Sequence, residues 1–453
     1  MFSQYKVGLV MNHLSLIKAR LLASLSYCVL LMLALLTATS VQASIWDKSN
    51  FDFKFATVVS GTTLNLEGSS FGDTFPINAF TELSNDEYRL ELRPEISADY
   101  NDCHAVLKPR IRGQYFDDMG PFDGETEGDI FFNTASLTCG LGKGFELSVG
   151  RQKYLWGNSQ FRSPSNPFFA EGVLFNPTDE VTGKDLTILT YRPDYSWEFS
   201  IISNWDESHI DQVPNPSSVF ISTSAIKIEY LGGNFQSGLI LSKRDNKDAR
   251  LGGFGSLTVN DSFVAYGEFS ISSDVDGLLP ERDSTGELTR FVVADQVDDK
   301  TRATWLLGGS YTFRNDWTAY VEYLHSDQGF NDVQADEWLS LANRGRSFLG
   351  TDRMDEGVLI LADAFDPLWR QTRQNYAVLQ LSRSQLYDKS DIAFQYVRNL
   401  DDNSSSASAS INYALGDFGE LFFVASHNSG GGSRELGRIV NNAFQLGVKI
   451  YTF

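Results

Sequence analysis

The stretch DEYRLELRPEISADY, residues 86–100, sorts by parity into two opposite chemistries. From residue 87 onward the odd positions are charged or polar, whereas the even positions are apolar or aromatic. Successive side chains of a β-strand point to opposite faces, so the stretch predicts a strand with one charged face and one apolar face. A soluble sheet can use such a strand with its apolar face on a core. The choice between that sheet and the wall of a membrane barrel depends on the rest of the sequence.

The N-terminus has the segment order of a secretory signal peptide. Basic residues precede an apolar run at residues 21–38, and Val41-Gln42-Ala43 forms a small-residue cleavage site. An inner-membrane anchor is the alternative, because the apolar run approaches the length of a spanning helix. We expect cleavage, which leaves residues 1–43 as the signal peptide and residues 44–453 as the mature domain.

The charge of the chain excludes nucleic acid as a partner. The formal net charge is -21, and removal of the signal peptide takes away three basic residues and no acidic one, which leaves -24. Such an acidic chain offers no basic surface to a phosphate backbone. After Ala43 no window contains about 18 consecutive apolar residues, so we expect no further spanning helix.

Period-2 segments fill the mature chain, and we expect about 18 strands of roughly 9 to 14 residues each. The connections between them alternate in length, with 245–248 and 401–405 as two brief exceptions. Outer-membrane barrels have short periplasmic turns and long extracellular loops. The pattern therefore predicts an all-β, antiparallel, up-and-down barrel in the cell outer membrane. The short connections are 100–102, 141–144, 193–196, 232–234, 260–261, 314–316, 386–389 and 417–419, and the long ones are 65–85, 117–129, 158–184, 209–220, 274–300, 327–374 and 428–441.

The next expected strand has a similar alternation, in which basic residues alternate with apolar ones. We expect the apolar faces to meet hydrocarbon and the charges to line a wet lumen. There they either brace the wall through lateral ion pairs or present a field that favours anions. Arg151 and Lys153 have the parity of apolar residues, so we expect a bulge near Gly150 to turn them inward. The expected pore-lining residues are Glu87, Arg89, Glu91, Arg93, Glu95, Lys108, Arg110, Arg112, Arg151, Lys153, Arg344, Arg346 and Arg353.

A channel of this strand number needs a constriction, because an open barrel would be wide. Two connections, Asn158–Lys184 and Asp327–Gln374, are far longer than a simple turn. The second contains a short helix expected at Asp336–Asn343 and the last three of the expected pore-lining arginines. Each loop can fold into the pore or lie outside as a solvated lid, and the sequence leaves both arrangements open.

The C-terminus ends in Phe453 with Tyr451 two residues before it. This ending resembles the C-terminal signature that the barrel-assembly machinery reads in outer-membrane proteins. The resemblance implies that machinery, outer-membrane lipid and lipopolysaccharide as partners. The apolar parity changes after Ile450, so either a bulge lies there or the outward ladder is broken. Pro94 and Pro109 also require local bulges, because a closed barrel has no free edge for a residue without an N–H.

A second resemblance lies in VGRQKYLWG, residues 149–157, which is followed by Asn166-Pro167 and Asn176-Pro177. This pattern resembles the alginate-export type of outer-membrane channel. The resemblance implies a barrel of about 18 strands that passes an anionic polymer or small acids. We therefore expect a porin for a small or polymeric hydrophilic solute, anionic in charge, with no cofactor.

A lipid hydrolase is the alternative function. His427 and Ser429 share a strand face, and this H-x-S spacing resembles outer-membrane phospholipases and lipid A deacylases. Gly430 stands where those families usually have Asn. Because no acidic residue is identified to orient the histidine, the pair is a weak triad, and we expect no enzymatic activity. No metal-ligand spacing or phosphate-binding glycine motif stands out.

Two cysteines, Cys103 and Cys139, remain after the signal peptide is removed. Export places them in an oxidising compartment, where a pair tends to form a disulfide. Cys103 opens one expected strand and Cys139 lies near the end of the next, so antiparallel pairing brings both to the periplasmic rim. The sequence predicts a cross-strand disulfide between them, unless the two residues are buried apart.

Overall fold

The computed structural model describes residues 50–66, 84–117, 125–169, 180–206, 222–245, 247–273, 278–293, 300–365, 372–430, 434–437 and 440–452. The expected signal peptide lies outside these residues. The chain divides into two units. The larger unit, Phe53–Ser97 with Asp102–Phe453, contains the barrel. The smaller unit is Met1–Asp52 with Ala98–Asn101, of which residues 50–52 and 98–101 are described.

Eighteen strands form one antiparallel sheet in which strands adjacent along the sheet follow one another in the chain, apart from a separate hairpin. Alternation of polar and apolar residues specifies these strands, as the opening stretch, β2, illustrates. The strands are β1 (Asn50–Leu66), β2 (Asp86–Tyr100), β3 (Cys103–Asp117), β4 (Glu125–Gly142), β5 (Phe145–Gln152), β6 (Lys184–Tyr191), β7 (Trp197–Asp206), β8 (Thr223–Gly232), β9 (Phe235–Arg244), β10 (Ala249–Asn260), β11 (Phe263–Ser272), β14 (Arg302–Thr312), β15 (Thr318–Ser326), β16 (Asn375–Leu386), β17 (Ser390–Asn399), β18 (Ser405–Ala414), β19 (Gly419–Ser429) and β20 (Val440–Thr452).

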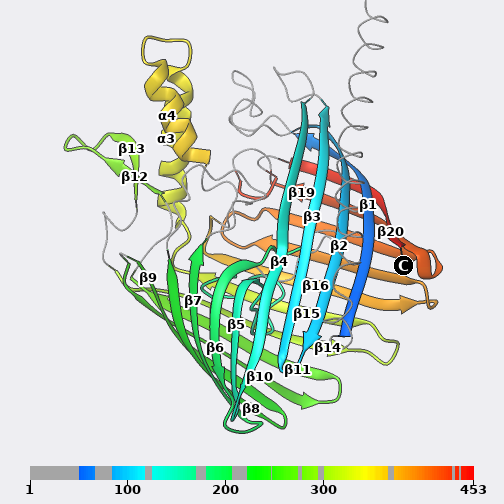
Figure 1. Ribbon diagram of the computed structural model, residues 1–453. Helices are drawn as coiled ribbons and strands as arrows, with labels where there is room; N and C mark the ends of the chain where they lie inside the picture. Colours follow the sequence, from blue (N-terminus) through cyan, green and yellow to red (C-terminus); the bar gives the residue numbers. More distant parts are fainter. Residues whose placement is uncertain are drawn as a thin grey trace, which may run out of the picture. The chain divides into compact units, whose positions relative to one another are not determined.

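The first and last strands close the sheet into a barrel. β1 pairs with β20 from Phe55 opposite Thr452 to Leu66 opposite Val440 (Figure 1). Closure leaves no edge of unpaired backbone N–H and C=O groups, which hydrocarbon could not satisfy. The expected all-β barrel of about 18 strands is confirmed.

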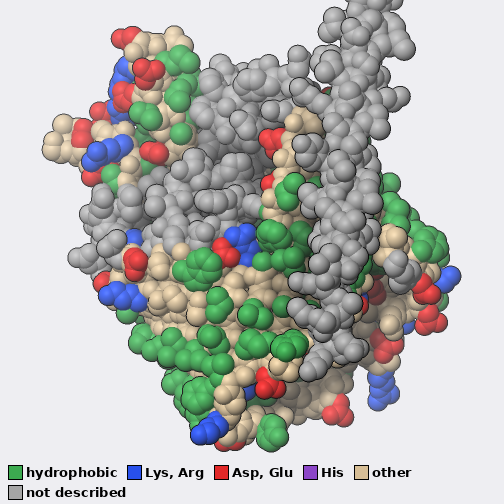
Figure 2. Space-filling model, viewed as in Figure 1, with side chains coloured by type: hydrophobic (Ala, Val, Ile, Leu, Met, Phe, Trp, Pro, Cys, Tyr) green, Lys and Arg blue, Asp and Glu red, His purple; other side chains and the backbone are tan. Residues whose placement is uncertain are grey.

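Apolar side chains cover the outside of the barrel. In β2, Tyr88 and Leu90 are 55% and 37% exposed, whereas Glu91 and Arg93 are 1% and 6% exposed. The even face of the opening stretch is therefore the outer face, and its charged face points inward. Figure 2 shows hydrophobic side chains gathered over the visible barrel wall, with charged side chains mainly toward its ends. This distribution suits a wall that is surrounded by lipid.

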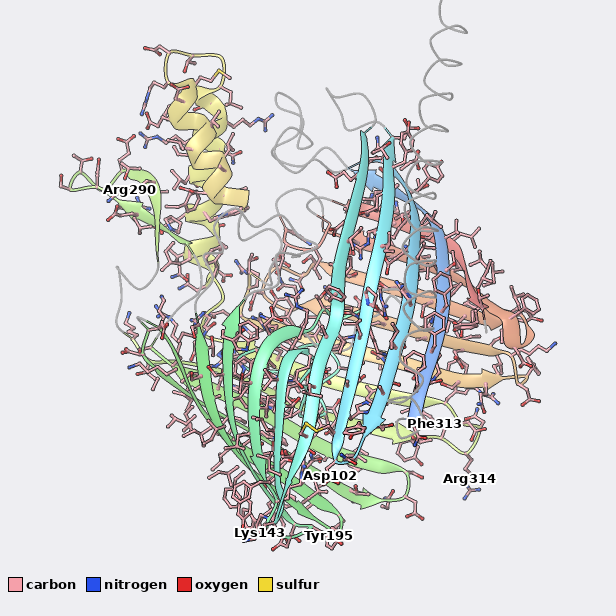
Figure 3. The ribbon with its side chains drawn as sticks, in the orientation of Figure 1. Asp102, Lys143, Tyr195, Arg290, Phe313 and Arg314 are labelled. Carbon is pink, nitrogen blue, oxygen red and sulfur yellow. A yellow bond between two sulfur atoms is a disulfide. The ribbon has the colours of Figure 1, made fainter. Side chains whose placement is uncertain are left out.

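Short and long connections segregate to the two ends of the barrel. Figure 3 labels Asp102, Lys143, Tyr195 and Arg314, which lie in short connections at one end, and Arg290, which lies at the other. The long connections between β5 and β6 and between β15 and β16 both leave from the end with Arg290. The alternation expected from the sequence is confirmed.

Two of the long connections contain their own secondary structure. β12 (Leu278–Arg282) and β13 (Leu288–Val293) form a hairpin, and α3 (Asp332–Phe348) and α4 (Met354–Phe365) form a helical pair. Hairpin and helices share an apolar cluster of their own, which includes Phe291 of β13 and Trp338 of α3. None of the helices in the described ranges is both long and apolar enough to cross a membrane.

The irregularities expected at Pro109 and after Ile450 have different outcomes, and the expected bulge at Pro94 stays a prediction. The register of β3 with β4 shifts between Lys108 and Pro109, so a bulge accommodates this proline. β20 pairs with β1 and β19 without a shift at Ile450. Ile450 is exposed on the outer face, whereas the Tyr451 hydroxyl donates to Glu420 of β19. The outward ladder is therefore broken after Ile450, and Phe453 lies outside the described residues.

Cys103 and Cys139 stand directly opposite each other in the register of β3 and β4. Their Cα atoms are 4.0 Å apart and their sulfur atoms form a disulfide. The Gly140 N–H donates to the Asp102 carbonyl at 2.8 Å beside it. The bridge thus fastens the short-turn end of two neighbouring strands.

We expect the double variant Cys103→Ser/Cys139→Ser to fold into the same barrel with lower stability. The bridge closes a loop with a sequence separation of 36 residues, and loss of such a cross-link costs about 3 kcal/mol. Urea unfolding in detergent micelles measures the difference. Equal unfolding midpoints with and without the bridge, or free thiols in the non-reduced wild type, would contradict this assignment.

Candidate functional site

Charged side chains on the inner faces of β2 and β3 pair with one another. Glu91 accepts from Arg93 Nε at 2.8 Å and from Arg112 Nε at 3.0 Å. Lys108 Nζ lies 2.9 Å from Glu95, and Arg110 is completely buried. The ion pairs run both along β2 and across to β3, so bracing of the wall is one role of this cluster. We call it the charge ladder, and it consists of Glu87, Arg89, Glu91, Arg93, Glu95, Lys108, Arg110 and Arg112.

A carboxylate from outside the strands completes the ladder. Glu180 accepts from Arg110 Nε at 2.8 Å and Nη2 at 3.0 Å, and from Asn133 Nδ2 at 2.7 Å. Burial alone would raise the pKa of the Glu180 carboxyl. Hydrogen bonding and attraction from Arg110, with further attraction from Arg93 and Lys153, outweigh burial and lower this pKa to about 2. Glu180 is therefore ionised throughout the physiological pH range.

Glu180 belongs to the long connection between β5 and β6, residues 153–183, which we call the constriction loop. Its described parts are 153–169 and 180–183. Trp156, Phe168 and Phe169 of this loop pack against apolar residues that β6 to β10 turn inward. An apolar inner wall in contact with water would be unfavourable, and the loop covers it. The inward-facing residues of this cluster are Leu186, Ile188, Ile202, Ala225, Ile240 and Phe254.

Two buried glutamates on distant strands hold the middle of the constriction loop. Glu322 of β15 accepts from the backbone N–H groups of Gln160 at 2.7 Å and Phe161 at 3.0 Å. Glu268 of β11 accepts from the Ser159 N–H at 3.3 Å and the Ser165 hydroxyl at 2.8 Å. A loop that starts at β5 thus reaches β11 and β15, so it lies inside the barrel. This resolves the choice between a folded-in loop and an outer lid for residues 158–169.

A buried lysine fixes the start of the constriction loop. Lys227 Nζ of β8 lies 4.9 Å from the ring centroid of Tyr154 and 5.6 Å from that of Trp156. It also lies 3.0 Å from Glu198 of β7, which accepts from the Tyr154 hydroxyl at 3.0 Å. Cation–π contact and ion pairing together satisfy a charge that is otherwise removed from water.

Glycines in the 149–157 motif are required by the geometry. Gly157 has φ +80, and a Cβ there would lie 2.1 Å from a carboxylate oxygen of Glu268. Gly150 has φ +114, and a Cβ there would lie 2.2 Å from the Ala135 carbonyl oxygen. Only glycine combines a left-handed backbone with such close approach. The motif therefore encodes how the chain leaves β5 and enters the barrel.

Arg151 and Lys153 have different surroundings. β5 keeps its register with β4 and β6 through Gly150, so the expected bulge is not there. Arg151 keeps the parity of outward-facing Val149 and forms an ion pair with Asp185 of β6 at 2.6 Å. Lys153 lies beyond the strand, near the ladder. Burial lowers its pKa, as do the charges of Lys108 and Arg110, against the opposite effect of Glu180.

Of the three arginines expected in the second long loop, Arg344 and Arg346 lie in α3 and Arg353 lies in the connection between α3 and α4. Arg344 lies in α3, pairs with Glu287 at 3.0 Å and donates to the Leu288 carbonyl of the β12–β13 hairpin. Arg353 pairs with Glu356 at 2.6 Å. Arg346 lies in the last turn of α3. These contacts tie the arginines to the hairpin and helices.

His427 and Ser429 lie on the outer parity of β19. His427 Nδ1 lies 2.8 Å from Asn442 Oδ1, and the Ser429 hydroxyl is hydrogen-bonded to Ser405 at 2.7 Å. Within the described chain, no hydrogen bond joins the histidine to the serine. The contact between base and nucleophile on which a triad depends is thus missing from this arrangement. The described residues also contain no cluster of His, Cys, Asp and Glu that could hold a metal ion.

Four charged side chains of the site were not identified from the sequence. Glu268 and Glu322 are each the single acidic residue of a strand that is otherwise mostly apolar or aromatic, which is the one signal that could have singled them out. Lys227 carries the same signal in β8. Glu180 has no such signal, because it follows no strand pattern.

Solved structures are similar to this chain in fold, whereas no protein-family model and no curated protein matches its sequence. OprD of Pseudomonas aeruginosa is 11% identical with a TM-score of 0.50, over 88% of this chain and 95% of that one. OccK5 (OpdH) of the same organism is 8% identical with a TM-score of 0.50, over 89% and 99%. OprD is an outer-membrane protein. The expected fold, an antiparallel β-barrel like that of OprD, is confirmed. The likeness to the alginate-export type finds no support from a family model.

We expect Glu268→Ala/Glu322→Ala to release the middle of the constriction loop. Glu322 accepts from two groups of the loop and Glu268 from three, and a hydrogen bond to a charged group contributes about 1.5 to 3 kcal/mol. Single-channel recording in planar bilayers should show a larger and noisier conductance. The control is Glu420→Ala, which removes an inward carboxylate of β19 that contacts Tyr451. A conductance equal to that of the control would show that these carboxylates do not hold the constriction.

The Glu180 anchor should be insensitive to pH until strongly acidic conditions. A carboxyl with a lowered pKa contributes stability above its ordinary value, here 4.5, and loses it as pH falls through about 2. The wild-type conductance should therefore stay constant from about pH 7 to about pH 3 and rise near pH 2. Glu180→Gln should show the raised conductance at every pH, whereas Glu281→Gln in the hairpin should behave as wild type. A wild-type rise centred on pH 4.5 would contradict the lowered pKa.

Proposed function

We propose that the protein is a channel of the outer membrane that passes small hydrophilic solutes and favours anions. The observation that carries this proposal is the constriction loop, which enters a closed barrel and is held by carboxylates on β11 and β15. A barrel needed only as a structural wall would have no use for such a loop. Restriction of an aqueous passage gives it a purpose.

The charges of the ladder support the preference for anions. The eight residues of the ladder together with Lys153 and Glu180 comprise six basic and four acidic side chains. Ion pairs neutralise most of this charge, and two positive charges remain in excess. Field lines are focused by the low-dielectric wall of a pore, so a small excess is sufficient to bias ion passage. The strongly acidic balance of the whole chain does not oppose this bias, since distant exposed charges are screened by salt.

A lipid hydrolase remains the alternative with the weaker support. Its residues His427 and Ser429 have separate hydrogen-bond partners, Asn442 and Ser405. The channel and the hydrolase are separated by one comparison in reconstituted membranes. Stepwise conductance without acyl-ester hydrolysis supports the channel. Hydrolysis that disappears in His427→Ala, without any conductance, supports the enzyme.

We expect removal of positive charge near the ladder to shift ion selectivity toward cations. Lys153→Gln and Lys108→Gln should each lower the anion-to-cation permeability ratio by about twofold, as expected for one partly screened charge. Reversal potentials in a salt gradient measure this ratio. Arg290→Gln removes the same charge from the β12–β13 hairpin and should leave the ratio unchanged. Cation preference in the wild type, or equal ratios in all three variants, would refute the ladder as the source of selectivity.

A further inference from the structure

The inner wall of the barrel is covered unevenly. Contacts of the described constriction loop fall on β2 to β4, β6 to β11, β15 and the first residues of β16, where the ring centroids of Phe161 and Tyr376 are 5.8 Å apart. In the described parts of the loop, no such contact reaches the middle of β17, β18 or β19. The described parts of the loop therefore leave the inner faces of these strands, and of β16 from Gln380 onward, uncovered.

The uncovered strands present a continuous set of uncharged polar side chains. Exposed outer residues fix the parity: Phe394 in β17, Ile411 in β18 and Phe423 in β19 are 47%, 40% and 39% exposed. Residues of the opposite parity point into the barrel. We call the inward residues of this region the hydroxyl wall, and they are Gln380, Gln395, Ser408, Ser410, Asn412 and Ser426.

Register arranges the hydroxyl wall as a row and a column. Gln380 stands opposite Gln395, Gln395 opposite Ser408, and Ser408 opposite Ser426. Ser410 and Asn412 continue from Ser408 along β18. Neighbours in the row are about 4.8 Å apart and neighbours in the column about 6.6 Å apart, from strand geometry. These distances are comparable with the separations between hydroxyl groups on a short polyol.

The polar groups of this wall are free to bind a solute. In the part of the chain that the structure describes, the hydroxyls of Ser408, Ser410 and Ser426 make no hydrogen bond, and Asn412 Oδ1 is buried without a partner. The amides of Gln395 and Gln380 share one contact at 3.3 Å. Ser410 is buried, whereas Ser408 and Ser426 are partly exposed. Because buried polar groups are normally satisfied, groups on this inner face that lack a protein partner are available to water or to a solute.

We infer that the hydroxyl wall is a binding track for hydroxyl-rich solutes of the size of a pentitol or a monosaccharide. Serine, asparagine and glutamine offer both donors and acceptors, and a polyhydroxylated solute can exchange its water for them at several adjacent positions. The small serine side chains leave room for such a solute beside the strand. An ion or a simple polyether lacks the matching series of donors. The inference rests on the proposed channel function and adds the class of solute.

The test uses the mature protein in planar bilayers under potassium chloride. Xylitol, which carries a hydroxyl on every carbon, should reduce the ion current in a saturable manner. Triethylene glycol, a polyether of similar mass, should reduce the current only in proportion to its concentration, as an inert volume does. Current reduction is measured over a concentration series of each compound.

The matched variants separate solute binding from pore size. Ser408→Ala/Ser410→Ala/Ser426→Ala removes three hydroxyls without adding bulk, so it should preserve the salt conductance and weaken xylitol binding by at least about tenfold. Ser200→Ala is the control, because this inward serine of β7 is hydrogen-bonded to Glu198 and Tyr154 beneath the constriction loop. It should bind xylitol as the wild type does.

Two outcomes would overturn the inference and leave the channel intact. One is a conducting wild type in which xylitol and triethylene glycol have the same effect. The other is unchanged xylitol binding in the triple variant. A protein that conducts no ions at all would overturn the proposed channel function, and the inference with it.

Discussion

The pairing of β1 with β20 is the constraint on which the rest of the structure depends. An open sheet in hydrocarbon would leave two rows of backbone N–H and C=O groups without partners, at a cost of several kcal/mol for each group. Closure removes both rows, and the register from Phe55 opposite Thr452 to Leu66 opposite Val440 does so without interruption until its last step. Once the sheet is closed, every strand has one face toward lipid and one face toward the interior. The alternation in β2 has a function only because of that closure.

Closure creates a second problem, because the interior of a barrel of this strand number is too wide for side chains alone to fill. The two halves of the barrel solve it differently. β6 to β10 turn apolar residues inward, and the constriction loop covers them with Trp156, Phe168 and Phe169. β2 and β3 instead carry charges that form ion pairs, and the loop reaches them through Glu180. The loop is thus held at one side by burial of apolar surface and at other points by charged groups.

The barrel could be predicted from the sequence to a large extent, whereas its interior could not. Period-2 alternation and the lengths of connections depend on local chemistry, so they identified the strands, their pairing and the opposition of Cys103 and Cys139. The partners of Arg151 and Arg344 depend on residues far away in the chain, Asp185 and Glu287. Inward apolar residues such as Ile202 in β7 contradict a simple rule of polar inside and apolar outside. The loop that covers these inward apolar residues has no periodic sequence pattern, so its position cannot be predicted from alternation.

The glycines at 150 and 157 connect the barrel strands, which the sequence predicts, with the interior loop, which it does not. The sequence motif around them resembles a motif of other channels. The structure explains the two glycines by local geometry, independently of that resemblance. Gly150 allows β5 to pass against the Ala135 carbonyl, and Gly157 allows the loop backbone to approach the Glu268 carboxylate. A side chain at either position would displace the loop from the glutamates that hold it, because the contacts of a Cβ would fall near 2 Å. The position of the constriction loop inside the barrel follows from where the backbone leaving β5 can turn inward.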